Sequence, residues 1–180
     1  RSCGGRLQGC ANKPGGRLII TGLQAEVGTA ATALLCPGEG KALKPRFVNV
    51  MAGCDAWPIA RSIEFFKAAM DIASKHDAVC SFETHRGRSF YCPWNTAAVL
   101  EALPDIKLTC DFSHWVVVSE RLMDSEWDAI ELAARHAHHV HGRVGYDQGP
   151  QVPHPAAPEY AEALASHQRC WEAIWADQTR

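Results

Sequence analysis

The sequence lacks the long apolar run that a membrane-spanning helix requires. Crossing a bilayer as a helix takes about 20 consecutive, mostly apolar residues, and no run in these 180 residues approaches that length. The first sixteen residues, RSCGGRLQGCANKPGG, also contain no apolar signal core. These absences predict a soluble protein, which we place in the cytoplasm unless an organelle-targeting segment precedes Arg1.

An excess of positive charge is also missing. Lys and Arg total 18, Asp and Glu total 20, and the formal net charge is -2. Nucleic-acid binding depends on neutralising phosphates, so this balance argues against a nucleic-acid partner. No G-x-G-x-x-G follows an expected strand, and no G-x-x-x-x-G-K-S/T occurs, so the common dinucleotide and nucleotide motifs are absent as well.

The eight cysteines contain no C-x-x-C pair. That spacing is typical of zinc knuckles and redox motifs. Several cysteines lie inside apolar, strand-like runs, where Cys behaves as a small hydrophobic residue. We therefore expect reduced thiols in the core and loops of an intracellular protein.

Apolar residues make up 47% of the chain, enough for one globular domain with a substantial core. We expect an irregular N-terminal segment at 1–16 and a single domain at 17–180. Within the domain, strand-like and helix-like patterns alternate, which predicts an α/β fold with a parallel sheet. Expected strands lie at 17–28, 46–53, 78–85, 106–112 and 138–145; expected helices lie at 57–76, 93–104, 125–137 and 159–177, with a short helix and loop at 29–45 and a proline-rich loop at 149–158.

Polar side chains gather at the ends of the expected strands. Glu83, Asp111 and His141 lie near the carboxyl ends of three successive strands, where the loops of a parallel α/β fold converge. Two carboxylates brought together repel unless a cation lies between them. Oxygen and nitrogen donors suit Mn²⁺, Mg²⁺, Zn²⁺ or Co²⁺. The pattern therefore predicts a divalent metal held by these three residues.

Each residue taken alone has a simpler interpretation. Glu83 could pair with Arg86 or Arg88, and Asp111 could close the turn after its strand. At least one histidine of HAHHVHGR is expected to be a structural hydrogen-bonding residue. Strand alternation places His139, His141 and Arg143 on the same face.

Three stretches in order, SFETHRGR, LTCDFSHW and HVHGRVGYDQGPQV, resemble the xylose isomerase-like TIM-barrel superfamily of sugar phosphate isomerases and epimerases. The likeness covers about residues 46–176, and 17–28 less closely. It implies a (β/α)8 barrel whose metal is bound by Glu83, Asp111 and His141. It also implies that His114 contacts a substrate hydroxyl and that Arg143, and more loosely Arg86, bind substrate. Glu83 and His114 would be the catalytic residues.

The resemblance predicts a metal-dependent isomerase or epimerase of a sugar, sugar phosphate or similar polyhydroxylated carbonyl compound, acting through an enediolate. Such barrels carry a second metal-binding Glu on the last strand, and no strand follows the helix at 159–177. With about five expected strands, the chain is predicted to be a partial barrel that lacks this Glu. A partial barrel has an unpaired sheet edge, through which two copies of the chain could pair into a homo-oligomer. Two alternatives stay open: an endonuclease IV-like metal phosphodiesterase and a catalytically inactive barrel fragment.

Overall fold

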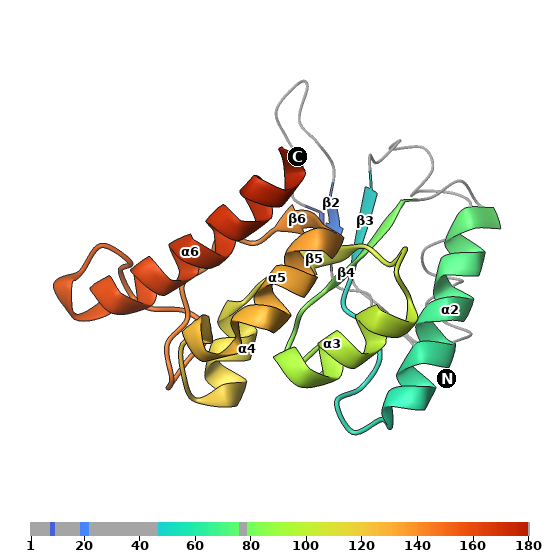
Figure 1. The fold of residues 1–180 in the computed structure, drawn as a ribbon, viewed down its shortest axis with the longest axis horizontal. Coiled ribbons are helices and arrows are strands. Elements are labelled where there is room, and N and C mark those ends of the chain that lie inside the picture. The colour runs from blue at the N-terminus through green and yellow to red at the C-terminus, as the bar shows by residue number, and fades with distance from the viewer. Residues whose placement is uncertain (1–7, 10–18, 22–46, 76–78, 180) are drawn as a thin grey trace.

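The computed structural model describes residues 8–9, 19–21, 47–75 and 79–179 (Figure 1). The expected boundary between 1–16 and 17–180 and the expected helix and loop at 29–45 lie outside the described residues. The elements in chain order are β1 (Gln8–Gly9), β2 (Ile19–Thr21), β3 (Phe47–Val50), α2 (Ile59–Lys75), β4 (Cys80–Glu83), α3 (Pro93–Ala102), β5 (Leu108–Cys110), α4 (Ser113–Ser119), the 3-10 helix η2 (Met123–Glu126), α5 (Trp127–His136), β6 (Ala137–Val140), the 3-10 helix η3 (Pro158–Tyr160) and α6 (Ala161–Gln178).

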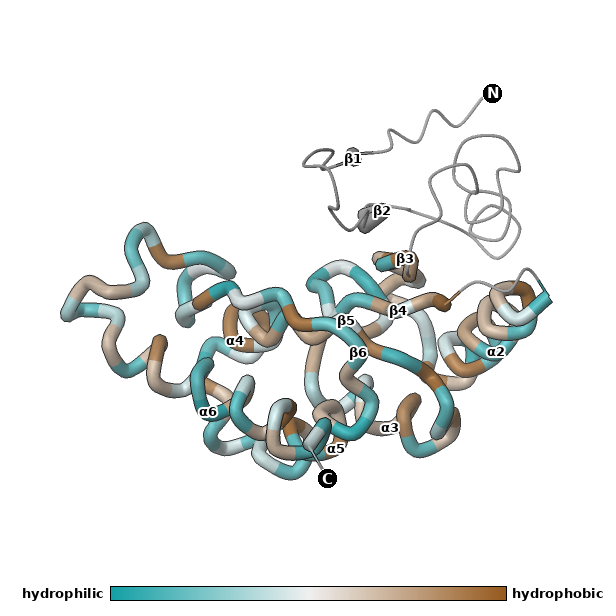
Figure 2. Tube along the Cα trace, turned by 90° about the horizontal axis from the view of Figure 1, so that it is seen from above, coloured by the Kyte–Doolittle hydropathy of each residue, from teal (hydrophilic) through white to brown (hydrophobic). Residues whose placement is uncertain are grey.

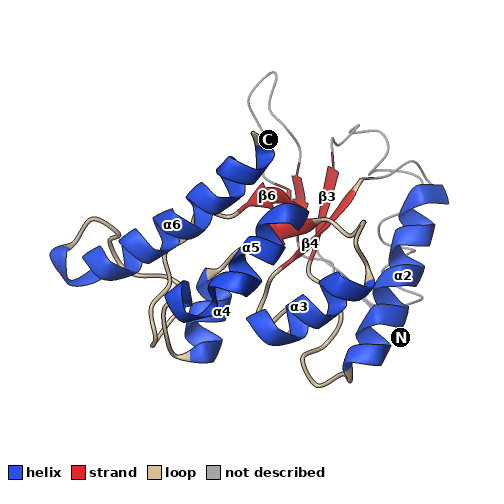
Figure 3. Cartoon of the chain, viewed as in Figure 1, coloured by secondary structure: helices blue, strands red, loops and turns tan. Residues whose placement is uncertain are grey.

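The strands form one sheet in the order β1-β2-β3-β4-β5-β6. Strands β2 to β6 run parallel to their neighbours, and β1 pairs antiparallel with β2. Helices connect successive strands from β3 onward, which is the arrangement that parallel neighbours require (Figure 3). The predicted α/β class with a parallel sheet is confirmed.

Helices α2, α3, α5 and α6 lie along one side of strands β3 to β6 (Figure 2). The main core fills the space between these two layers, as the stacked rings of Phe66 on α2 and Phe90, 4.3 Å apart, illustrate. The sheet is strongly curved, because Phe47 of β3 reaches the rings of His138 and His139 on β6 at 5.0 and 5.1 Å although two strands stand between them.

Two sequence predictions about the strands differ from the structure. The segment 1–16 was expected to be irregular, yet Gln8–Gly9 forms β1, because it pairs with β2. The last strand ends at Val140 instead of 145. The N–H of Arg143 donates to the carbonyl of His141 at 2.8 Å, and this tight turn ends the strand. His141 and Arg143 therefore belong to a loop and do not share a strand face with His139.

Helix α4 was not expected either. Its sequence, SHWVVVS, contains three β-branched valines, which have low helix propensity. Tertiary packing overrides that preference, because Trp115 and Val116 are buried in the main core and the indole N–H of Trp115 donates to the carbonyl of Phe90 at 3.1 Å. Across the described residues, no helix combines the length and apolar character needed to cross a membrane.

Candidate metal centre

Strand alternation aims Glu83 and Asp111 at the same side of the sheet. The ring of Phe82 on β4 lies 4.9 Å from that of Phe66 on α2, so the next residue, Glu83, points to the opposite side of the sheet, away from α2, α3, α5 and α6. On β5, the thiol of Cys110 faces Ala133 of α5, so Asp111 points away from the helices too. Both carboxylates lie at the carboxyl ends of neighbouring parallel strands and are at most 6% exposed.

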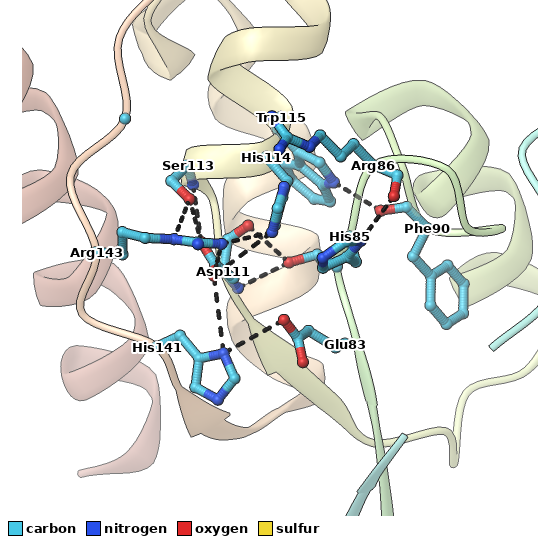
Figure 4. Close-up of polar contacts among 12 residues, drawn as sticks. Glu83, His85, Arg86, Phe90, Asp111, Ser113, His114, Trp115, His141 and Arg143 are labelled. Atoms are coloured by element: carbon cyan, nitrogen blue, oxygen red, sulfur yellow. Dashed lines mark hydrogen bonds and ion pairs between the residues drawn. The ribbon is translucent and has the colours of Figure 1, made fainter. Parts of the chain in front are cut away.

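His141 joins them from the loop after β6. Its backbone N–H still donates to the carbonyl of Cys110 at 3.0 Å, which holds it beside the end of β5. From there Nδ1 of His141 lies 3.4 Å from Oε1 of Glu83 and 3.7 Å from Oδ2 of Asp111 (Figure 4). The three side chains that the sequence predicted to meet are therefore brought together.

The spacing of these atoms fits a shared divalent cation. One ligand atom from each residue lies within 4.8 Å of the other two. Ligands bound about 2.1 Å from one ion are separated by roughly 3–4 Å, close to the spacing of the three side chains. Two oxygens and one imidazole nitrogen suit Mn²⁺, Zn²⁺ or Co²⁺, and Mg²⁺ less well because it prefers an all-oxygen shell.

The three groups stabilise one another's charged forms. Burial alone would raise the pKa of Glu83, but hydrogen bonds and the charge of His141 outweigh it and lower that pKa. Burial also acts to raise the pKa of Asp111, and bonds from His141 and Ser113 with the charge of Arg143 lower it. Hydrogen bonds to Asp111 and Glu83 raise the pKa of His141 to about 9. At neutral pH the imidazole is therefore a cation between two carboxylates.

Arg143 supplies a second positive charge to the centre. Its Nη2 donates to Oδ2 of Asp111 at 2.6 Å and to Nε2 of His114 at 2.5 Å. Its Nε donates to Oγ of Ser113 at 3.0 Å, and the hydroxyl and the backbone N–H of Ser113 both donate to Oδ1 of Asp111. Arg143 is thus held in a fixed position next to the proposed metal ligands.

The bond from Arg143 sets the tautomer of His114. An arginine only donates, so Nε2 of His114 must accept and Nδ1 carries the proton. Burial lowers the pKa of His114 to about 4, although the charge of Asp111 acts to raise it, so the ring is neutral at pH 7. Among the described residues, Nδ1 of His114 is buried without a hydrogen-bond partner.

The ring of His85 lies against that of His114, with centroids 3.9 Å apart and the ring planes tilted by 44°. Glu83, His85 and His114 also have ligand atoms within 4.8 Å of one another, so Glu83 belongs to two candidate sets. The protonated Nδ1 of His114 and the guanidinium on its Nε2 make that ring a poor ligand in this arrangement. The first set is therefore the better candidate.

The remaining predicted substrate residue, Arg86, lies outside this cluster. It is exposed in the turn after β4, and no ion pair within the described part of the chain involves it. Its carbonyl lies 2.6 Å from Nδ1 of His85, which orients that ring.

Sequence reasoning missed several residues that support the centre. Asn49 of β3 donates to Oε2 of Glu83 at 2.7 Å and is fully buried. Thr84 bonds to the backbone N–H and carbonyl of Asp111 at 2.7 and 3.0 Å. A polar residue inside the apolar run FVNV was a usable signal for Asn49, because an amide buried in a strand needs a partner.

Comparison of the chain with protein-family models, with curated proteins and with solved structures gives no match. The functional argument therefore depends on the side chains of the centre and their geometry.

Proposed function

We propose that the chain binds a divalent metal through Glu83, Asp111 and His141 and belongs to a metal-dependent isomerase or epimerase of polyhydroxylated carbonyl compounds. The observation that carries the proposal is the convergence of two carboxylates and an imidazole at the carboxyl ends of parallel strands, with ligand atoms within 4.8 Å of one another. The curved parallel sheet is compatible with part of a TIM barrel, whose active site forms at this end of the strands.

Three protein ligands leave coordination positions free for substrate oxygens. A bound divalent cation would polarise a substrate carbonyl as a Lewis acid. The chain's own residues then have distinct roles. Glu83 accepts the proton from the carbon beside the carbonyl, and the electron pair of that C–H bond passes to the carbonyl to form the enediolate. The Nδ1–H of His114, which has no partner within the described part of the chain, donates a hydrogen bond to a substrate hydroxyl.

Arg143 keeps His114 in the donor tautomer that this role requires. Its guanidinium, 2.5 Å from Nε2 of His114, stabilises the form with the proton on Nδ1. It also screens the negative charge of Asp111 and so limits repulsion toward an enediolate. We expect substrates with adjacent carbonyl and hydroxyl oxygens, as in sugars and sugar phosphates.

Calorimetric titration with Mn²⁺ tests the metal proposal. Binding is expected in the wild-type chain and should be lost in Asp111→Asn and in His141→Ala. Asp105→Ala and His154→Ala are matched controls, because both side chains are exposed and neither belongs to a candidate ligand set. Unchanged Mn²⁺ affinity in the first two variants would refute the ligand assignment.

The reaction class is tested with a panel of aldoses, ketoses and their phosphates in D₂O. Mn²⁺-dependent exchange of the hydrogen beside the carbonyl, followed by NMR, is expected, and Glu83→Gln should abolish it. A chain that binds Mn²⁺ and exchanges no substrate hydrogen would favour the inactive-fragment alternative.

A metal phosphodiesterase is a second candidate, favoured by the overlapping set Glu83, His85 and His114. Two cations sharing Glu83 could activate water and bind a phosphodiester. Hydrolysis of bis(4-nitrophenyl) phosphate that depends on His85 would support this alternative, and its absence together with hydrogen exchange on sugars would exclude it.

A further inference from the structure

The loop that carries Arg143 is attached to helix α6 by a buried histidine. The backbone N–H of Gly145 donates to Nε2 of His167 at 3.2 Å, and His167 is 1% exposed. Nδ1 of His167 lies 2.8 Å from the carbonyl of Ala163, one turn earlier in α6. Because a carbonyl only accepts, Nδ1 carries the proton and Nε2 keeps a lone pair for Gly145. One neutral tautomer therefore satisfies both bonds, and burial lowers the pKa of His167 and so favours it.

The same loop packs against Ser113 without any spare room. A Cβ added at Gly145 would lie 2.8 Å from the carbonyl oxygen of Ser113 and 2.9 Å from its Cα. These are backbone atoms at the start of α4, and they cannot move aside as a flexible side chain could. The hydrogen bond that Gly145 donates to His167 therefore holds a residue whose backbone lies directly against that of Ser113.

Ser113 transmits this contact to the charged residues of the centre. Its hydroxyl donates to Asp111 and accepts from Nε of Arg143 at 3.0 Å. The backbone N–H of Arg143 also donates to the carbonyl of His141 at 2.8 Å. This bond closes a tight turn that contains both the arginine and one proposed metal ligand, His141. A displaced loop would move His141 and Arg143 together.

We propose that His167 is a positioning residue of the metal centre, acting through Gly145 and Ser113 on the placement of His141 and Arg143. The loop geometry is the evidence that His167 positions these two residues. The expected effect on metal affinity rests on the proposed function. Helix α6 carries none of the candidate ligands. Through His167 it would nevertheless control how well those ligands are aligned.

The test compares His167→Leu with His167→Gln in the full chain. Leu has a similar volume and no acceptor, whereas the Gln side-chain oxygen can accept from Gly145 without charge. In His167→Leu, amide hydrogen exchange at Gly145 is expected to accelerate at least about 10-fold, and the Mn²⁺ dissociation constant to rise about 10-fold, as for other residues that orient ligands. His167→Gln should restore most of both.

His136→Leu is the matched control for a purely structural effect. His136 also lies on a helix, and its Nδ1 bonds to the carbonyl of Ile106 at 2.9 Å, away from the centre. Its variant should change neither Gly145 exchange nor Mn²⁺ affinity. The proposal is overturned if His167→Leu leaves both measurements unchanged, or if His136→Leu alters them equally.

A second pair keeps the proposal testable if His167→Leu does not fold. Gly145→Ala introduces the Cβ that meets Ser113, whereas a Cβ at Gly142, in the same loop, meets nothing within 4 Å. Gly145→Ala should weaken Mn²⁺ binding about 10-fold and Gly142→Ala should not; equal effects refute the loop contact.

If the wild-type chain binds no Mn²⁺, the proposed function fails. Amide hydrogen exchange at Gly145 still decides whether His167 holds the loop.

Discussion

Ser113 shows how much one small side chain contributes at the residue scale. It lies two residues after Asp111, is fully buried, and bonds to both members of the Asp111–Arg143 ion pair. Removing its hydroxyl leaves Nε of Arg143 without its acceptor and Asp111 with one donor fewer. Asp111 is 1% exposed, and the loss of a hydrogen-bond partner by a buried group costs about 1–3 kcal/mol.

Ser113→Ala is therefore expected to lower the free energy of unfolding by about 1–3 kcal/mol, measured by urea denaturation. Ser119→Ala is the control, because the Ser119 hydroxyl lies at the other end of α4 and is buried with no partner among the described residues. Its removal should cost less than about 0.5 kcal/mol. Similar losses in the two variants would show that the Ser113 bonds contribute nothing specific.

The sequence predicted Glu83 and Asp111 as neighbours because both follow apolar strand residues and alternation fixes their direction. It predicted His141 for a partly wrong reason. The expected strand placed His141 in a regular alternation, whereas a tight turn after Val140 brings the side chain into position. Ser113 and His167 were not predicted, because their roles depend on a loop and on α6, which meet only in the folded chain.

At the scale of elements, α4 ends in a strained residue. Glu120 is its C-cap, with φ 52° and ψ 34°, the left-handed conformation. It is the one non-glycine residue with positive φ among those described. This conformation costs an L-residue about 1–2 kcal/mol, and glycine adopts it without that penalty. The strain predicts a simple stabilising substitution.

Glu120→Gly is expected to raise the free energy of unfolding by about 0.5 kcal/mol, since relief of strain is partly offset by the greater freedom of glycine in the unfolded chain. Val118→Gly, two residues earlier and inside α4, should instead lower it by about 0.5 kcal/mol, the difference in helix propensity between Val and Gly. Thermal denaturation of both variants checks the opposite signs. Destabilisation by Glu120→Gly would mean that its side chain makes a contact worth more than the strain.

The elements themselves were predicted where the local pattern and the packing agree. Helices α2 and α6 were predicted from apolar residues at helical spacing, and α3 from its bounding prolines, with Pro93 in the first turn as expected. Helix α4 was missed because valines favour strands, and only the burial of Trp115 and Val116 makes a helix the better solution. The sheet curvature seen in the Phe47–His138 contact depends on strand packing and has no local signal.

At the scale of the whole molecule, the buried charges predict a stability maximum near neutral pH. The pKa values of Glu83 and Asp111 are lowered by folding, so their stabilisation is complete above their unfolded values and disappears as the pH falls through the folded ones. The pKa of His114 is also lowered, to about 4. Between pH 6.5 and 4 the unfolded chain takes up a proton on this residue that the folded chain does not, and stability falls.

The alkaline side depends on His141. Its folded pKa, about 9, exceeds the usual 6.5, so its stabilisation is complete below 6.5 and is lost as the pH rises toward 9. In metal-free buffer, the free energy of unfolding measured by urea denaturation should fall by about 1–2 kcal/mol between pH 6.5 and 8. His141→Gln should remove this decline; an identical profile in the variant would show that His141 is not the responsible group.

The charges around Asp111 also bear on whether folding depends on the metal. Glu83 and Asp111 are matched by two cations already in the chain, Arg143 and the protonated His141. The fold consequently needs no ion to relieve carboxylate repulsion, unlike zinc fingers, which unfold when a chelator strips the metal. An incoming cation has to displace the His141 proton, so loading would acidify an unbuffered solution while the surrounding scaffold stays intact.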